Sequence, residues 1–192
     1  MSHRARFLAG AADPSRIPKS AFPEIAFAGR SNVGKSSLLN RLVGQHKLAR
    51  VSKTPGRTQQ INFFVVDDRL TFVDLPGYGF ARVPLHVKEE WKALVEHYLT
   101  HRPNLRAVVV IVDVRRGVMT DDAQLIDFLG AHALPLIVVA TKADKLGYND
   151  RARHVRFLAE QLAPHGVHPL VCSAPSGEGI DEVWRAIDRQ RG

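Results

Sequence analysis

The sequence predicts an α/β fold, in which a mostly parallel β-sheet has one antiparallel hairpin at its edge and helices cover both faces. Short apolar runs alternate along the chain with segments of helical periodicity, which is typical of this class. Two of these runs are separated only by a short polar turn, which predicts the hairpin. The chain has 192 residues, 45% of them hydrophobic, which suits one compact domain with an appendage.

The expected strands are short and almost entirely apolar, as buried parallel strands usually are. The first covers residues 24–28 and leads through a glycine-rich segment into a helix over residues 35–43. The hairpin is predicted from residues 61–66 and 70–74, which flank the polar turn Asp67-Asp68-Arg69. Further strands are expected at residues 107–112, 136–140 and 169–172.

The remaining helices are predicted from apolar residues that recur every three or four positions. In the segment 84–101 such residues form one stripe, and a proline stands in the first turn, where a helix tolerates it. The last helix is expected over residues 179–187, with Trp184 on its apolar face and therefore in the core. Two more helical segments are expected near residues 121–132 and 151–162.

Composition limits the classes of partner and compartment. The formal charge of +8 attracts polyanions such as RNA, DNA or anionic membranes, although a basic surface that only aids solubility is an equal alternative. Residues 1–20 are expected to be a basic, partly flexible arm. The single cysteine, Cys172, excludes an internal disulfide and a cysteine-built zinc site. No apolar run approaches the roughly 20 residues of a membrane span, so we expect a soluble, cytoplasmic protein, with a monomer as the default state.

The segment GRSNVGKSS follows the first predicted strand and precedes the first helix. It matches the pattern G-x-x-x-x-G-K-[ST], whose glycines let backbone N–H groups surround phosphate oxygens at a helix N-terminus. Lys35 is expected to reach the outer phosphates, and the Ser36 hydroxyl to bind Mg²⁺. The motif does not identify the base, so ATP and GTP both stay open here. The predicted nucleotide-binding residues of this segment are Gly29, Arg30, Ser31, Asn32, Val33, Gly34, Lys35, Ser36 and Ser37.

Two further segments supply partners for a nucleoside triphosphate. Asp74-Leu75-Pro76-Gly77 ends the second hairpin strand, which would place Asp74 beside Ser36 and the N–H of Gly77 near the terminal phosphate. The polar segment 52–60 is expected to be a switch loop that becomes ordered only in the triphosphate state. Within it, Thr58 is the predicted second Mg²⁺ ligand, with Thr54 as the competing candidate. The predicted binding residues of the two segments are Gly56, Arg57, Thr58, Gln59, Gln60, Asp74, Leu75, Pro76 and Gly77, of which Thr58 and Gly77 join Lys35 as candidate catalytic residues.

Base recognition is assigned to Thr141-Lys142-Ala143-Asp144, which follows the strand 136–140. The Asp144 carboxylate can accept hydrogen bonds from the ring N–H and the exocyclic amine of guanine, whereas adenine offers neither donor on that edge. A site built for such bonds rejects an analogue without the donors by roughly 10⁴ to 10⁵, so Asp144 predicts GTP as the ligand. Lys142 would pack its stem along the base. Cys172, Ser173 and Ala174, after the last strand, would face the guanine oxygen with their backbone.

Taken together, these motifs resemble the translation-factor-related P-loop GTPases of the TrmE-Era-EngA-EngB-septin-like branch, and specifically the EngB family, also called YihA or YsxC. The resemblance runs nearly end to end and rests on the strings ARFLAGAADPSRIP, PEIAFAGRSNVGKSSLLN, SKTPGRTQQINFF, FVDLPGYGFA and ATKADKL. It implies the three-layer, Ras-like P-loop GTPase fold, with a GTP-binding domain over residues 21–192. It also implies a bacterial-type GTPase that assists assembly of the large ribosomal subunit, with the precursor subunit and its rRNA as partners, and that is needed for normal cell division and septation.

The resemblance also bears on catalysis. Ras-like enzymes place a glutamine after the D-x-x-G glycine to orient the attacking water, whereas Tyr78 stands there in this chain. Slow hydrolysis is therefore expected, and an unassisted GTPase with the glutamine already turns over only on the order of 10⁻⁴ s⁻¹. Asn32 matches the asparagine with which relatives hold K⁺ beside the phosphates, which makes K⁺ stimulation a hypothesis. Thr141 replaces a more usual asparagine, so the bracing of its loop is expected to differ.

Two other functions stay open at this stage. One is a GTP-sensing module that binds RNA or the ribosome and in which hydrolysis is incidental. The other is an ATP-using P-loop enzyme, which would require a nucleotide selectivity that ignores Asp144.

Overall fold

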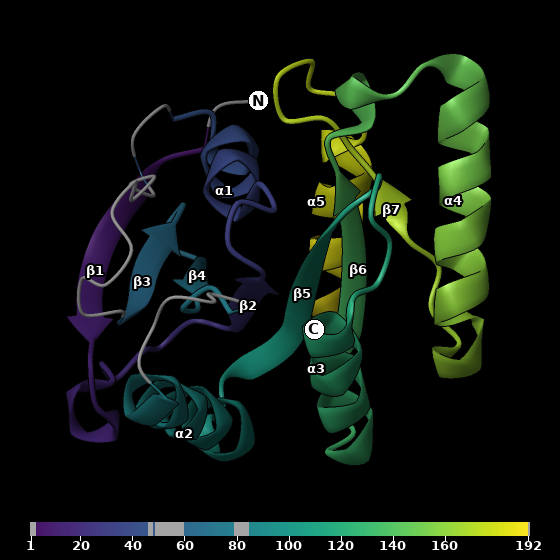
Figure 1. Cartoon of the computed structure of the whole chain (residues 1–192). Coiled ribbons are helices and arrows are strands. Elements are labelled where there is room, and N and C mark those ends of the chain that lie inside the picture. Colours follow the sequence, from purple (N-terminus) through teal and green to yellow (C-terminus); the bar gives the residue numbers. More distant parts are fainter. Residues whose placement is uncertain (1–2, 46–47, 49–59, 79–84, 192) are drawn as a thin grey trace.

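The computed structural model describes residues 3–45, 48, 60–78 and 85–191, and it has three layers (Figure 1). The strands are β1 (Ala5–Ala11), β2 (Glu24–Gly29), β3 (Ile61–Val66), β4 (Leu70–Asp74), β5 (Leu105–Asp113), β6 (Leu136–Thr141) and β7 (Leu170–Val171). The α-helices are α1 (Lys35–Val43), α2 (Leu85–His101), α3 (Thr120–Ala131), α4 (Tyr148–Leu162) and α5 (Ile180–Gln190), with short 3₁₀ turns η1 (Pro14–Arg16), η2 (Ala143–Lys145) and η3 (Ala163–His165).

The strands form one seven-stranded sheet in the order β1-β3-β4-β2-β5-β6-β7, which Figure 1 shows from one edge to the other. The pairs β4–β2, β2–β5, β5–β6 and β6–β7 are parallel, whereas β3 is antiparallel to both of its neighbours. The predicted fold class is therefore confirmed, including the antiparallel hairpin. Its turn, Asp67-Asp68-Arg69, lies between the paired residues Val66 and Leu70, and Asp67 and Asp68 have φ angles of 51° and 47°, a conformation that Asp tolerates in turns.

The N-terminal segment has a structure that the sequence did not predict. Residues 5–11 of the expected basic arm form β1, which pairs with β3 at the edge of the sheet. Just before it, His3 Nδ1 lies 2.6 Å from Asp67 Oδ2, and the His3 ring packs against Trp184 with the centroids 4.3 Å apart. The local sequence carries no signal for this strand, because it is stabilised by pairing with residues fifty or more positions away.

Each face of the sheet has its own core. Ile25 and Phe27 of β2 belong to the core covered by α1 and α5, while Ala26 and Ala28 belong to the core covered by α2, α3 and α4. This alternation follows from the two-residue period of a strand. Because both faces are covered, the strands read as continuous apolar runs. The carboxyl ends of β2, β5 and β6 then meet along one edge, where open α/β sheets bind ligands.

None of the helices in the described part of the chain is long and apolar enough to cross a membrane.

Candidate functional site

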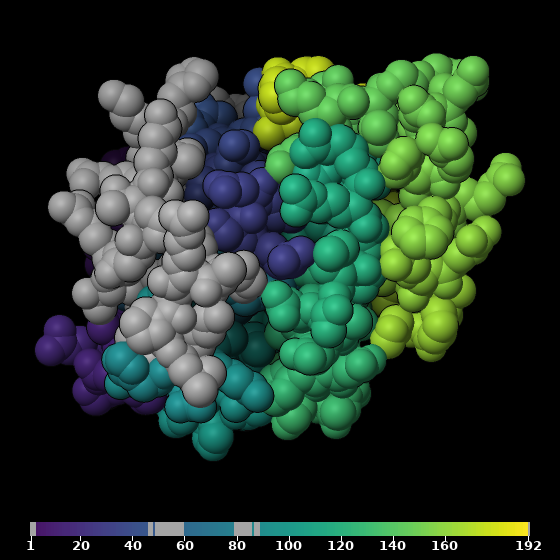
Figure 2. Space-filling view, in the orientation of Figure 1, coloured from purple at the N-terminus to yellow at the C-terminus, as the bar shows by residue number. Residues whose placement is uncertain are grey.

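The phosphate loop connects the end of β2 to α1. A Cβ atom on Gly29 would lie 2.9 Å from Val33 Cγ1 and 3.0 Å from the Ile111 carbonyl oxygen, so only glycine fits without displacing a neighbour. Gly34 caps α1 with a φ of 107°, a conformation that side chains rarely adopt. The loop therefore turns tightly, and the N-terminus of α1, a favourable place for anions, lies at this edge of the sheet. Figure 2 shows the blue-violet atoms of this region at the surface, next to green segments that follow β5 and β6.

Lys35 and Asp74 meet at the start of α1. The Lys35 ammonium group forms an ion pair with the Asp74 carboxylate, and both side chains are mostly buried. The pair forms because β4 and β2 are parallel neighbours in register, with Asp74 opposite Phe27. Ser36 follows Lys35 in the first turn of α1. The structure thus brings together the Lys and Asp that the motifs predicted, although they are 39 positions apart in the chain.

The segment after β4 lies against the phosphate loop. The Leu75 N–H donates to the Phe27 carbonyl at 3.0 Å, and the Ser31 N–H donates to the Tyr78 carbonyl at 3.0 Å. These bonds continue the pairing of β2 and β4 beyond the strand ends, so that Pro76 and Gly77 lie between two anchored residues. The Tyr78 hydroxyl donates to Asp122 Oδ1 at 2.8 Å. Burial and the neighbouring Asp122 carboxylate raise the pKa of Tyr78 well above its usual value, so the phenol stays protonated.

The predicted base-recognition loop is tied to the phosphate loop by two side chains. The Thr141 hydroxyl lies 2.6 Å from the Val33 carbonyl oxygen and 3.1 Å from that of Val112. The Lys142 ammonium donates to the Asn32 carbonyl at 2.6 Å. Thr141 thus supplies a brace between the two loops from the position where an asparagine is more usual.

The Asp144 carboxylate is held in place by its neighbours. Ser173 Oγ donates to Asp144 Oδ1 at 2.9 Å, and Lys145 Nζ lies 3.4 Å from Oδ2. Burial raises the pKa of Asp144, but the hydrogen bonds from Ser173 and Lys145 outweigh it, so the pKa lies below its usual value and the group is ionised near neutral pH. The Ala143 N–H donates to the Cys172 carbonyl at 3.2 Å. The two segments predicted to hold the base therefore lie side by side.

Cys172 itself is buried, which raises the pKa of its thiol to about 12. The thiol is therefore neutral and unreactive, and any contribution of residues 172–174 comes from their backbone and from the Ser173 hydroxyl.

Sequence reasoning missed Asp113, the last residue of β5. Its buried carboxylate lies 3.0 Å from Lys142 Nζ and 2.6 Å from Arg115 Nη2. Burial raises the pKa of Asp113, but the hydrogen bonds from Arg115 and Lys142 outweigh it and hold the pKa at about 2. Asp113 thus positions Lys142, the residue predicted to pack along the base. The available signal was its place at the end of a buried strand, the same place that Asp74 has in β4.

Four predicted site residues, Gly56, Arg57, Thr58 and Gln59, lie outside the described residues, as does the competing candidate Thr54. The role of Thr58 as a Mg²⁺ ligand stays a prediction. Gln60, the next residue, is described, and its side-chain amide donates to Asn62 Oδ1 at 3.0 Å.

Comparisons with known proteins agree with this geometry. Residues 24–142 match the model of a family described as 50S ribosome-binding GTPase. The chain is 50% identical to a probable GTP-binding protein EngB of Solibacter usitatus over 97% of this chain and 95% of the relative. It is 46% identical to the protein of that name from Streptococcus pneumoniae, over 97% and 96% of the two chains. A crystal structure of a probable GTP-binding protein engB, 31% identical, superposes with a TM-score of 0.70 and covers 86% of this chain and 97% of that one.

Proposed function

The chain belongs to the EngB family of GTP-binding proteins, and on this premise we propose that it binds GTP and GDP with Mg²⁺, hydrolyses GTP slowly and assists assembly of the large ribosomal subunit. By the same resemblance, cell division and septation depend on it, and it acts in the cytoplasm. The observation that carries the nucleotide assignment is the connection between the two loops. Because Thr141 and Lys142 join the base loop to the phosphate loop, one ligand with a base and phosphates spans both.

The preference for guanine rests on Asp144. An ionised carboxylate held by Ser173 and Lys145 presents two acceptor oxygens, which matches the two donors of guanine. An Asp144→Asn variant should lose GTP affinity and gain affinity for xanthosine triphosphate, because an amide can donate to the additional carbonyl. Calorimetric titration of the unchanged protein and of the Asp144→Asn variant with GTP, xanthosine triphosphate and ATP tests this. Equal binding of ATP and GTP by the unchanged protein would support the ATP-using alternative.

The residues at the start of α1 suit Mg²⁺ bound together with phosphates. Mg²⁺ prefers hard oxygen ligands and keeps several waters, and it is commonly bound by one or two protein groups plus substrate phosphates. Ser36 offers a hydroxyl and Asp74 a carboxylate in the same region, while no group of three His, Cys, Asp or Glu side chains in the described residues could hold a metal without the nucleotide. When bound, the ion would neutralise charge that develops on the β- and γ-phosphates. Lys35 would turn from Asp74 to the same phosphates.

Slow hydrolysis follows from Tyr78, whose hydroxyl is bound to Asp122 and does not replace the water-orienting glutamine. We include K⁺ as an activator in the proposal, because Asn32 lies at the rim of the phosphate loop and a monovalent cation there would offset transition-state charge as an arginine finger does. The test compares GTP turnover in K⁺ and Na⁺ with ribosomal particles present. Identical rates would remove K⁺ from the proposal.

The proposed ribosomal role rests on the family description and on the charge of +8, which suits rRNA. Large-subunit precursors should be retained by the protein with GTP or a non-hydrolysable analogue and released with GDP. The logarithm of the affinity should fall with the logarithm of salt concentration. Nucleotide-independent, salt-insensitive retention would contradict the proposal. If the particles bind but do not accelerate hydrolysis, the alternative of a GTP-sensing module with incidental hydrolysis is favoured.

A further inference from the structure

We propose that Tyr78, through its bond to Asp122, is a positioning residue that sets the preference of the site for GTP over GDP. This inference rests on the proposed function, in which the N–H of Gly77 meets the γ-phosphate. Tyr78 directly follows Gly77, so whatever restrains Tyr78 also restrains that N–H.

Three elements converge on this tyrosine. Its backbone pairs with the phosphate loop, where the Tyr78 carbonyl accepts the Ser31 N–H at 3.0 Å and the Tyr78 N–H faces the Gly29 carbonyl at 3.4 Å. Its ring packs against the core that α2, α3 and α4 cover, and its hydroxyl donates to Asp122 at 2.8 Å. The side chain therefore links the segment after β4 to the start of α3.

Asp122 is a rigid anchor. Its residue is only 2% exposed, and while Oδ1 accepts the Tyr78 hydroxyl, Oδ2 accepts the Met119 N–H at the start of α3 at 3.0 Å. A carboxylate held in this way by a helix terminus has little freedom to follow a moving loop. By contrast, the Tyr78 N–H bond at 3.4 Å is longer than the usual range for N–H···O bonds. The hydroxyl bond is the shorter restraint and is made to an acidic group, which makes it the stronger one.

The bond between Tyr78 and Asp122 should affect the binding of GTP but not that of GDP. A loop that is already held near the phosphates loses little conformational freedom when it contacts a ligand, whereas a loose loop loses more and binds more weakly. GTP has the γ-phosphate that the Gly77 N–H would contact, and GDP does not. Loosening Tyr78 should therefore weaken GTP binding and leave GDP binding almost unchanged.

The test is Tyr78→Phe, which removes one oxygen atom. We expect the affinity for a non-hydrolysable GTP analogue to fall about tenfold, equivalent to ~1.4 kcal/mol and close to the low end for a hydrogen bond to a charged group. The affinity for GDP should change less than about twofold. Both constants are measured by calorimetric titration in the presence of Mg²⁺.

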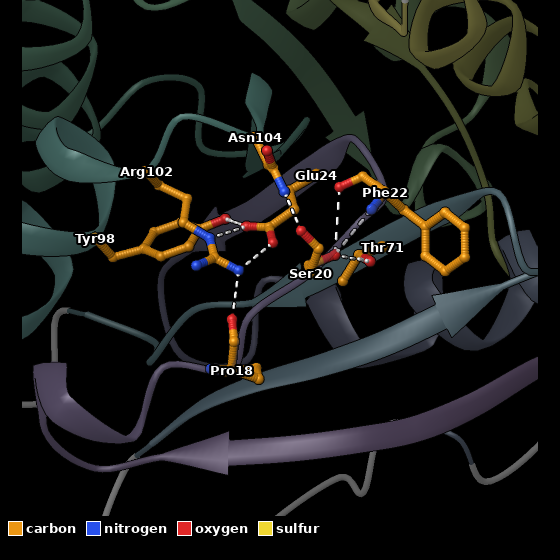
Figure 3. Close-up of polar contacts among 8 residues, drawn as sticks. All are labelled: Pro18, Ser20, Phe22, Glu24, Thr71, Tyr98, Arg102 and Asn104. Carbon is orange, nitrogen blue, oxygen red and sulfur yellow. Dashed lines mark hydrogen bonds and ion pairs between the residues drawn. The ribbon is translucent and has the colours of Figure 1, made fainter.

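Tyr98→Phe is the matched control. Tyr98 is also buried, and its hydroxyl donates to the Glu24 carboxylate at 2.9 Å (Figure 3). Glu24 begins β2 and Gly29 ends it, so the control lies about 16 Å from the phosphate loop at ~3.3 Å per residue. Both variants remove the same atom from the same kind of bond, and both should lose stability in urea. Only Tyr78→Phe should change the ratio of the GTP-analogue and GDP affinities.

The outcomes separate the inference from its premise. If Tyr78→Phe leaves the ratio at the value of the unchanged protein, or lowers both affinities equally, the positioning role is refuted while guanine-nucleotide binding stands. If the unchanged protein binds neither nucleotide, the proposed function fails as well.

Discussion

Replacing Thr141 with valine tests whether the two loops of the site act as one unit. Valine has nearly the shape of threonine, so the change removes a hydroxyl and leaves the packing intact. Thr141 is 2% exposed, and its hydroxyl lies 2.6 Å from the Val33 carbonyl oxygen, to which it donates, and 3.1 Å from that of Val112. Leaving a buried acceptor without its partner costs about 1–3 kcal/mol of unfolding free energy. The hydrogen bond also holds the two loops in the arrangement that the ligand requires. Its net contribution of about 0.5–1.5 kcal/mol corresponds to a roughly two- to tenfold loss of GDP affinity in the variant.

The assay pairs urea unfolding with calorimetric titration of GDP, and Thr71→Val serves as the control. Thr71 is fully buried at the start of β4, and its hydroxyl lies 3.2 Å from Ser20 Oγ, remote from the site (Figure 3). Both variants should lose stability, but only Thr141→Val should lose GDP affinity. If Thr141→Val is destabilised and still binds GDP like the unchanged protein, the brace does not couple the loops and the reasoning is wrong.

Three further predictions concern stability in urea. Arg102→Met should lower the unfolding free energy by about 3–5 kcal/mol, because it leaves the fully buried Glu24 carboxylate without the guanidinium group whose Nε donates to it at 2.8 Å. A loss below about 1 kcal/mol would contradict this. The pKa of Asp113 is held at about 2 against an ordinary 3.8, so its contribution to stability is complete above pH 3.8 and is lost as the pH falls towards 2. Asp113→Asn should therefore flatten the decline of stability between pH 4 and 2, and an unchanged slope would refute the assignment. Gly179→Ala should lower the unfolding free energy strongly, since the new Cβ would lie 2.1 Å from a β7 carbonyl oxygen at a φ of 74°. Gly130→Ala in α3, where a Cβ would have nothing within 4 Å, should raise the unfolding free energy by up to about 1 kcal/mol. Equal effects of the two substitutions would contradict this prediction.

The predicted elements agree with the structure where the signal is local. The strand expected at 61–66 is β3 residue for residue, and the helix expected at 35–43 is α1, because a polar turn and a glycine loop delimit them. The strand expected at 107–112 extends to 105–113 as β5. Its ends depend on pairing with β2 and β6, which periodicity does not show.

In the candidate site, too, some residues could be predicted from the local sequence and others could not. Its motif residues were predictable because their type follows from local geometry, as with Gly29 and Gly34, or from the chemistry of a ligand, as with Lys35 and Asp144. Asp113 and the bond between Tyr78 and Asp122 were not, because each depends on side chains from different elements.

Sequence alone determined the order of the elements, the glycine positions and the residues suited to phosphate and guanine. Tertiary structure decided which of them meet. The Thr141 hydroxyl donates to a carbonyl 108 positions earlier in the chain, and β1 forms by pairing with β3. Hydrogen bonds act over about 3 Å, so such contacts exist only once the strand order has brought distant parts of the chain to the same edge.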